Sequence, residues 1–215
     1  MTRIAYVCCD PGVPVFGRKG CSVHVQEVVR ALIAAGAEVE IFAVRIDGPV
    51  PPGLEATVVH RVPVPAAADA ASRELALLSS NASLEEIIER AGPFDVVYER
   101  HALWAHAGME YARRHGMAGL LEVNAPLVEE QAEHRLLHHR ALAEEVAARA
   151  FDAATALLAV SPAVASHLDR HREAAGRVHV VANGVDPRRF EVPATRGDRD
   201  DVAIAFVGTL KPWHG

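Results

Sequence analysis

A short loop near the start of the chain combines residue types that can hold an anion. Gly17 and Gly20 enclose the basic pair Arg18 and Lys19, and His24 follows within the next helical turn. An apolar run precedes the loop and apolar residues at helical spacing follow it, which predicts a strand, a loop and a helix in that order. Backbone N–H groups and the positive end of a helix meet at such a junction. We therefore expect a site for a phosphate or another anion.

The glycine spacing matches neither of the two common phosphate-binding motifs. It is not the G-x-G-x-x-G of dinucleotide-binding folds, and the chain contains no G-x-x-x-x-G-K-[ST] of P-loop enzymes. An ordinary strand-to-helix turn is therefore the alternative interpretation of this loop. For His24, the alternative is a half-buried histidine beside the apolar stripe of the helix.

Polar side chains also follow two later apolar runs. Glu99, Arg100 and His101 come after one predicted strand, and Glu122 and Asn124 lie at the end of the next. Because the carboxyl ends of parallel strands share one edge, we expect these residues to line one crevice with the glycine loop. The alternatives are a surface ion pair for Glu99 and Arg100, a paired core carboxylate for Glu122 and a turn for Asn124.

Other sequence motifs, present or missing, limit the reactions and ligands that we expect. Glu129 follows Asn124 closely enough to line the rim of the crevice, although it also fits a solvated helix face. The remaining histidines lack metal-ligand spacing, and the chain has neither an H-E-x-x-H motif nor a Cys/His cluster, so we predict no metal. Without a G-x-S-x-G elbow, serine hydrolysis is also unsupported.

The composition indicates a globular protein that does not bind nucleic acid. Half of the 215 residues are hydrophobic, and the formal net charge is -6 with a pI of about 6.0. A chain of this charge creates no field that attracts DNA or RNA. The cysteines Cys8, Cys9 and Cys21 form no C-x-x-C pair, and we interpret them as free thiols in a reducing compartment. Cys8 and Cys9 should face opposite sides of a sheet.

No targeting or membrane signal is evident. Met1-Thr2-Arg3 leads directly into an apolar run, and no apolar run approaches the roughly 20 residues that span a bilayer. No basic amphipathic helix with aromatic anchors occurs, so membrane association is not indicated. We expect a cytoplasmic protein.

Apolar runs alternate with helical patterns along most of the chain, and hairpin signals are missing. The expected strands are residues 4–7, 38–44, 56–62, 94–98, 117–123, 157–160 and 178–181. This alternation predicts an α/β fold, a doubly wound Rossmann-like parallel sheet with helices on both faces.

Helical patterns fill the intervals between these strands. Gly36 should end the first helix. Asn81-Ala82-Ser83 should separate two further helices, with Ser83 as the N-cap of the second. Residues 103–114 should form a helix and residues 127–156 one or two helices, and Ser161-Pro162 should begin another.

The composition changes near residue 183. We expect a first domain at 1–182, a hinge or linker at 183–201 that begins with Asn183 and Gly184, and a strand and loop at 202–215. This last strand either opens a truncated second domain, which we favour, or adds to the edge of the first sheet.

Taken in this order, the motifs resemble the retaining glycosyltransferases of the GT-B fold, group 1 (family 4). The matching segments are 16–20, 23–25, 98–100, 121–126, 160–161, 181–186 and 206–210. The resemblance implies transfer of a sugar from a nucleotide-sugar donor to an acceptor, with retention and without a metal. The donor is a substrate, so no further cofactor is expected. The acceptor could be a sugar, a lipid or a small molecule.

The resemblance also suggests roles for individual residues. The loop from Gly17 to Gly20, with His24, would lie near the donor diphosphate. Glu122, Asn124 and His101 are the candidate catalytic residues, and the acceptor crevice would contain Glu99, Arg100 and Glu129. Gly208 and Lys211 would open the donor-binding domain, which the chain otherwise lacks.

The chain departs from the family pattern at three positions. Many members have a histidine where Asn124 stands, an arginine in place of Thr209 and a lysine in place of His214. Without its second domain, the chain should be inactive alone. The alternatives are a non-catalytic sugar- or phosphate-binding domain and another nucleotide-sugar enzyme such as an epimerase.

Overall fold

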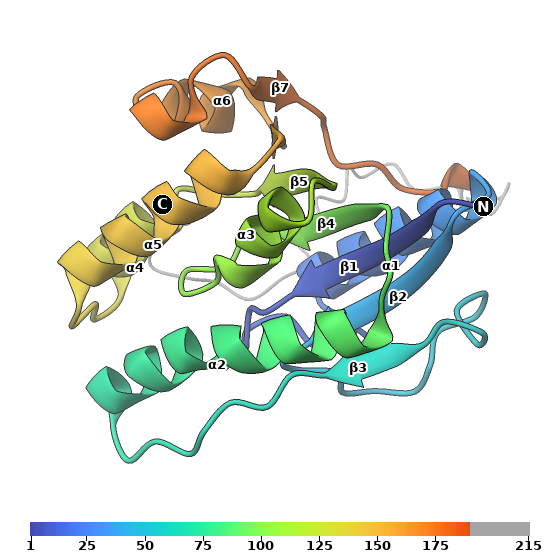
Figure 1. Cartoon of the computed structure of the whole chain (residues 1–215), viewed down its shortest axis with the longest axis horizontal. Helices are drawn as coiled ribbons and strands as arrows, with labels where there is room; N and C mark the ends of the chain where they lie inside the picture. The colour runs from blue at the N-terminus through green and yellow to red at the C-terminus, as the bar shows by residue number, and fades with distance from the viewer. Residues whose placement is uncertain (190–215) are drawn as a thin grey trace, which may run out of the picture. The chain divides into compact units, whose positions relative to one another are not determined.

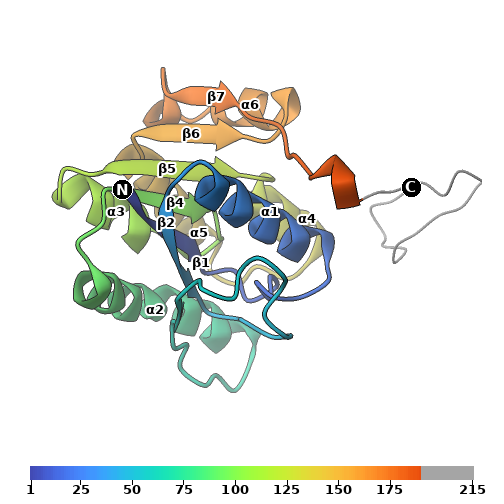
Figure 2. The same ribbon diagram turned by 90° about the vertical axis from the view of Figure 1, so that its right-hand side faces the viewer.

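Seven short strands form one parallel sheet in the computed structural model, which describes residues 1–189 (Figure 1). The strands are β1 Arg3–Cys8, β2 Glu38–Ala43, β3 Val59–Arg61, β4 Val96–Arg100, β5 Ala118–Val123, β6 Ala156–Ala159 and β7 Val178–Val180. They lie in the order β3-β2-β1-β4-β5-β6-β7, and Figure 2 shows β5, β6 and β7 pointing the same way. The predicted doubly wound α/β fold is confirmed.

The chain runs outward in both directions from the middle of the sheet. β2 and β3 follow β1 on one side, whereas β4 to β7 follow one another on the other side. The strand order therefore reverses between β1 and β4, and ligands of such sheets bind beyond the carboxyl ends of the strands at that point. Cys8 pairs with Arg100, which pairs with Glu122, so these positions align at that edge.

Helices cover both faces of the sheet (Figures 1 and 2). The helices are α1 Gly20–Ala34, α2 Ala70–Ala91, α3 Ala107–Arg114, α4 Leu127–His134, α5 Arg140–Ala153 and α6 Pro162–Leu168, followed by the 3-10 turn η1 Arg172–Ala174. The α1 residues Val25 and Val29 share one core cluster with Tyr6 and Ile41. Apolar residues of α2, α3, α5 and α6 share a second cluster with the opposite sides of the strands.

The two faces separate neighbouring residues at the end of β1. Cys8 is 0% exposed and belongs to the cluster under α1, whereas Cys9 is 7% exposed and belongs to the other cluster. The prediction that these two cysteines face opposite sides is confirmed, and both are free thiols.

Gly36 ends the first helix, as predicted. Its φ of 90° is a conformation that glycine adopts at little cost, and its N–H donates to the carbonyl of Ile33 at 2.9 Å. The next N–H, from Ala37, donates to Leu32 at 3.1 Å. These bonds satisfy carbonyl groups that the helix end leaves without partners.

The second helix is longer than its sequence pattern indicates. α2 is continuous from Ala70 to Ala91, so the predicted break at 81–83 and the N-cap role of Ser83 are wrong. The helix begins instead with a capping box, in which Asp69 Oδ1 accepts from the N–H of Ser72 at 2.7 Å.

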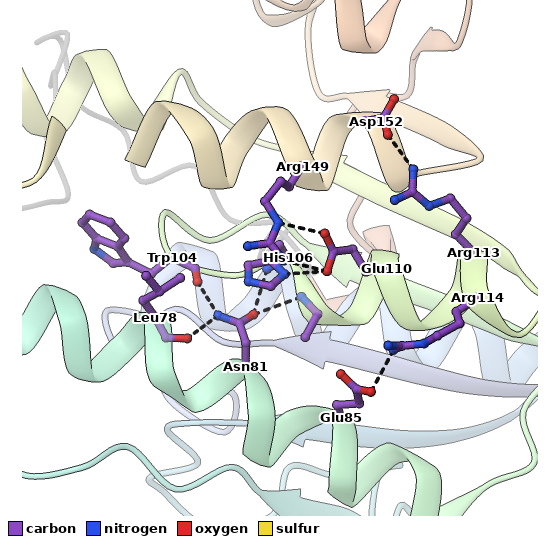
Figure 3. A network of polar contacts seen from close by, with 11 residues as sticks. Leu78, Asn81, Glu85, Trp104, His106, Glu110, Arg113, Arg114, Arg149 and Asp152 are labelled. Atoms are coloured by element: carbon purple, nitrogen blue, oxygen red, sulfur yellow. Dashed lines mark hydrogen bonds and ion pairs between the residues drawn. The ribbon is translucent and has the colours of Figure 1, made fainter. Parts of the chain in front are cut away.

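Asn81, which had suggested a break, caps a neighbouring helix from within α2 (Figure 3). Its Oδ1 accepts from the N–H groups of His106 and Ala107 at 2.9 and 3.0 Å, at the start of α3. Its amide group donates to the carbonyls of Leu78 at 2.7 Å and Trp104 at 2.8 Å. This capping explains why α3 begins at Ala107 and not at residue 103 as predicted.

Ion pairs join α3 to α5 and α3 to α2 (Figure 3). Arg149 of α5 donates two hydrogen bonds of 2.9 Å to Glu110 of α3, and Arg114 of α3 lies 2.9 Å from Glu85 of α2. α2, α3 and α5 are therefore connected by polar contacts as well as by their apolar core.

The remaining helix predictions agree with the structure. The span predicted as one or two helices contains α4 and α5. Ser161 caps α6, since its Oγ accepts from the N–H of Val164 at 3.3 Å, and Pro162 is the first helical residue.

The chain divides into two compact units, Met1–Gly184 and Val185–Gly215. The described part of the second unit contains the 3-10 turn η2 Pro187–Arg189 and an ion pair between Asp186 and Arg188 at 2.8 Å. The predicted strand at 202–208, with Gly208 and Lys211, lies outside the described residues. Among the described helices, none has the length and apolar character needed to cross a membrane.

Candidate functional site

Four side chains surround the carboxylate of Glu122 at the end of β5. His24 Nε2 lies 2.9 Å from Oε1, Arg100 Nη1 donates to Oε1 at 3.0 Å and Asn124 Nδ2 donates to it at 2.6 Å. The hydroxyl of Tyr98 donates to Oε2 at 2.7 Å. We call these five residues the Glu122 cluster. It joins α1, β4 and β5 above the sheet edge.

The surroundings keep Glu122 ionised. Burial alone would raise its pKa, since the residue is only 3% exposed. The hydrogen bond and charge of His24, with the hydrogen bonds from Asn124 and Tyr98, instead lower the pKa to about 2. Because an ionised carboxylate can only accept, His24 Nε2 must carry a hydrogen atom.

This geometry disfavours proton transfer by Glu122 at neutral pH. Three donors already occupy Oε1 and one occupies Oε2, and the lowered pKa opposes proton uptake at neutral pH. Its hydrogen bonds hold the side chains of His24, Arg100 and Asn124 in place, and its catalytic role stays a prediction.

The glycine loop lies exposed at the start of α1. Arg18, Lys19 and Gly20 are exposed, and Lys19, at the N-cap position, makes no side-chain capping bond. The first N–H groups of a helix have no acceptor within it, so they can meet an anion here. Gln26 holds the loop by donating to the carbonyls of Val15 at 3.0 Å and Gly17 at 2.9 Å.

The two glycines of the loop have different surroundings. A Cβ on Gly17 would lie 2.6 Å from Pro14 Cγ and 3.0 Å from both Pro14 O and Ser22 Oγ, so Gly17 permits close packing. A Cβ on Gly20 would meet nothing within 4 Å. Gly20 therefore borders open space in front of the helix end, where a ligand could approach.

The predicted single crevice is divided by the sheet. Successive residues of a strand point to opposite faces, so Tyr98 and Arg100 join Glu122 whereas Glu99 and His101 point away from it. Glu99 lies under α3, where a Cβ on Gly108 would be 2.4 Å from Glu99 Oε2. Glu99 therefore does not share a crevice with Arg100, and its role toward an acceptor stays a prediction.

Glu99 is completely buried and differs electrostatically from Glu122. Burial raises the pKa of Glu99 to about 8, and the backbone N–H of Met109 opposes this rise. Within the described residues, neither carboxyl oxygen completes a hydrogen bond of normal geometry. The side chain is therefore protonated at neutral pH.

His101 lies on the same side as Glu99 and does not join Asn124 or the carboxylate of Glu122. Only its backbone N–H reaches Glu122, through the carbonyl at 2.8 Å. Burial, and then the charges of His167, Arg100 and His171, lower its pKa to about 4, so the ring is neutral. With Glu129, His167 and His171 it lines a cavity of about 240 Å³, which we call the His101 cavity.

Sequence reasoning missed a larger cavity of about 310 Å³, which we call the apolar pocket. It lies between α2, α4 and the ends of β1 and β4, and its lining includes Leu77, Leu84 and Trp104 with the polar residues Arg73 and Asp10. The sequence feature that could have indicated this pocket is Trp104, one of two tryptophans in the chain. Asn183 and Gly184, the predicted hinge, are exposed at the end of the first unit.

The sequence pattern of Glycosyltransferase Family 4 matches residues 18–189, whereas no curated protein sequence matches the chain. A UGT transferase from Siraitia grosvenorii, solved in complex with UDP, has a TM-score of 0.54 over 86% of this chain and 51% of its own, at 9% identity. A glycosyltransferase from Rickettsia africae has a TM-score of 0.53 over 88% of this chain and 45% of its own, at 18% identity.

A sucrose-phosphate synthase chain from Thermosynechococcus elongatus has a TM-score of 0.56, at 13% identity, over 88% of this chain and 93% of its own. At such identities the likeness shows the fold alone. This chain spans about half the length of the Siraitia and Rickettsia structures. The family pattern, in contrast, covers most of the sequence, and the chain therefore belongs to Glycosyltransferase Family 4.

Proposed function

We propose that this chain is the acceptor-binding part of a retaining glycosyltransferase that takes a sugar from a nucleotide-sugar donor without a metal or a further cofactor. One observation carries the proposal: a helix end suited to an anion and the apolar pocket lie at the same edge of the sheet. The segment at 10–12 connects them, since Asp10 and Gly12 line the pocket and Lys19 Nζ donates to the carbonyl of Gly12 at 3.3 Å.

The start of α1 is the part that would face the donor diphosphate. The leaving diphosphate gains negative charge as the bond to the sugar breaks, and fixed N–H dipoles and cations stabilise that charge. The first N–H groups of α1 and the exposed side chains of Arg18 and Lys19 supply both. Gly20 leaves room for the phosphate to approach the backbone.

The Glu122 cluster would hold the groups that face the transferred sugar. Glu122 fixes the rings and planes of His24, Arg100 and Asn124 through hydrogen bonds. Asn124 is half-buried, so its amide can present polar atoms to a sugar hydroxyl while remaining attached to Glu122. We assign the cluster to positioning and not to proton transfer.

The apolar pocket would take the acceptor. Leucines, alanines and one tryptophan form about half of its lining, and its polar side chains include Asp10, Arg73 and Glu74. This favours an acceptor with an apolar portion, whether a lipid, a small molecule or a substituted sugar. The three free cysteines favour a cytoplasmic protein, where thiols stay reduced.

The decisive experiment measures sugar transfer by the full-length gene product with a panel of nucleotide-sugars. Gly20→Val should raise the KM for the donor at least roughly tenfold, because its side chain fills the phosphate approach. Gly20→Ala should have a smaller effect. Since a side chain at this position meets nothing in the described chain, both variants should unfold at the same urea concentration as the wild type.

Charge removal provides a matched comparison. Replacing Arg18 and Lys19 by alanine should also raise the KM for the donor. Arg90→Ala, at the exposed end of α2, should leave that KM unchanged. Unchanged transfer by Gly20→Val would refute the placement of the diphosphate. Nucleotide-sugar binding without turnover would favour a non-catalytic binding protein, and interconversion of the free nucleotide-sugar would favour an epimerase.

A further inference from the structure

A second group of polar side chains lies apart from the Glu122 cluster, on the opposite face of the sheet. Glu129 of α4, His167 of α6 and His171 each offer one ligand atom, and these atoms lie within 4.8 Å of one another. Glu129 Oε1 is 3.7 Å from His167 Nδ1. We call these three residues the His167 cluster.

The fold brings these residues together from two parts of the chain. His167 and His171 are four residues apart, and the turn after α6 keeps their rings adjacent, with centroids 4.9 Å apart. The N–H of His171 donates to the carbonyl of Leu168 at 2.9 Å and fixes this turn. Glu129 approaches from the first turn of α4.

Two imidazoles and one carboxylate are a ligand set that suits zinc and similar divalent ions. Zn²⁺ accepts nitrogen and oxygen ligands in tetrahedral sites, and sites with three protein ligands keep a fourth position for water or another ligand. The fold offers an opening for that position, because all three residues line the His101 cavity of about 240 Å³.

An independent observation points to a ligand in the same cavity. His101 also lines it, is only 5% exposed, and neither of its ring nitrogens has a hydrogen-bond partner in the described chain. A buried polar group without a partner is costly, so such a group marks a place where a water molecule or a ligand belongs. A water molecule on a metal ion in this cavity would be one such partner.

The cationic side chain of Arg170 contacts one histidine of the His167 cluster. Its Nη2 donates to His167 Nδ1 at 2.7 Å, and Arg170 itself is exposed. The guanidinium therefore occupies a lone pair that a metal ion needs, and a metal that binds Nδ1 must displace it. This competition gives the site a test in which one substitution should strengthen binding.

We propose that Glu129, His167 and His171 bind one divalent transition-metal ion of the zinc class, with its open position toward the His101 cavity. The site is separate from the sugar-transfer chemistry proposed above, since it lies across the sheet from the Glu122 cluster. It depends on side chains of α4, of α6 and of the turn after α6, and on no donor domain, so it can be measured by itself.

The test is titration of the purified chain with Co²⁺, free of any affinity tag, followed by visible absorption and competition with Zn²⁺. One ion per chain should give the visible bands of a low-coordinate Co²⁺ site, and Zn²⁺ should abolish them. Glu129→Gln and His167→Ala should each weaken binding at least roughly tenfold. Arg170→Ala should tighten it, because the competing guanidinium is gone.

Matched control variants distinguish the loss of this metal site from unspecific changes in Co²⁺ binding. Glu130→Gln, the exposed neighbour on α4, and His179→Ala, the exposed histidine of β7, should leave Co²⁺ binding unchanged. Because His167 is buried and its loss could disturb folding, Glu129→Gln is the decisive variant, with circular dichroism as the fold control. The proposal is overturned by the lack of stoichiometric binding, by unchanged affinity in Glu129→Gln, or by weaker binding in Arg170→Ala.

Discussion

Glu122 and Glu99 are two buried glutamates on neighbouring strands, and their environments are opposite. Glu122 accepts hydrogen bonds from four side chains on the α1 face of the sheet. Glu99 lies under α3 on the other face, without a completed hydrogen bond in the described chain. The pKa of the first is lowered to about 2, and that of the second is raised to about 8.

The comparison shows that hydrogen-bond donors account for the difference in charge between these two buried carboxyl groups. Burial raises the pKa at both sites and is the largest influence at each. Only at Glu122 do hydrogen bonds and the charge of His24 outweigh it. The two glutamates should therefore respond in opposite ways to substitution and to pH.

The largest expected effect is the loss of Glu122. Glu122→Ala leaves the donors of Tyr98, His24 and Arg100 buried around an empty position, which should cost about 3–5 kcal/mol of unfolding free energy at pH 7. Urea unfolding measures this. Glu144→Ala, which removes a carboxylate from an exposed ion pair, is the control and should cost less than about 1 kcal/mol.

The stability that Glu122 contributes to the fold should also depend on pH. Because the folded pKa of Glu122 lies below the ordinary 4.5, its stabilisation is complete above pH 4.5 and is lost as the pH falls toward 2. Equal costs for Glu122→Ala and Glu144→Ala would mean that the cluster contributes no net stability.

Glu99 should show the opposite pH dependence. Its folded pKa lies above 4.5, so the folded protein retains a proton that the unfolded chain loses, and stability falls as the pH rises from about 4.5 to about 8. Relative to Glu99→Gln, the wild type should lose about 1.4 kcal/mol for each pH unit in this window.

Urea unfolding at several pH values measures that slope, and Glu86→Gln, an exposed change on α2, is the matched control. If wild type and Glu99→Gln gave parallel lines across the window, Glu99 would be ionised in the fold, and its contrast with Glu122 would disappear.

A smaller effect should follow from removing one donor of the Glu122 cluster. Tyr98→Phe deletes a hydrogen bond to an ionised carboxylate while three donors remain, and should cost about 1.5 kcal/mol. Tyr111→Phe loses a similar hydrogen bond, of 2.7 Å, to the exposed Glu89 and should cost less. If both substitutions cost the same in urea unfolding, the buried cluster gives no special advantage to its donors.

The smallest effect should come from Asn124→Ala. Asn124 is half-buried, so water can replace its contact with Glu122, and the cost should stay below about 1 kcal/mol. Thermal or urea unfolding measures it. A loss as large as that of Tyr98→Phe would show that Asn124 is a structural member of the cluster and not an accessible one.

The sequence was sufficient to predict the sheet and most of its helices. Strands buried on both faces read as continuous apolar runs, and the spacing of Gly36 and Ser161-Pro162 identified helix ends from local chemistry. The predicted break in α2 failed because Asn81 finds its partners at residues 104–107, and no local pattern contains that information.

The candidate site was predicted less completely than the fold. His24, Arg100, Glu122 and Asn124 do come together, as their positions at two strand ends and at the start of α1 predicted. Adjacent strand residues face opposite sides, a rule that could have excluded Glu99 from the same crevice. The apolar pocket and the His167 cluster depend on where α2, α4 and α6 pack, which the sequence alone does not specify.

Asn81 has a consequence for recognition as well as for helix capping. It lines the apolar pocket, yet its two N–H groups and both lone pairs of its oxygen are already used within the protein. An occupant that placed a hydroxyl group against this wall would give up hydrogen bonds to water and gain none. The saturated amide of Asn81 thus favours occupants that turn an apolar group toward this residue.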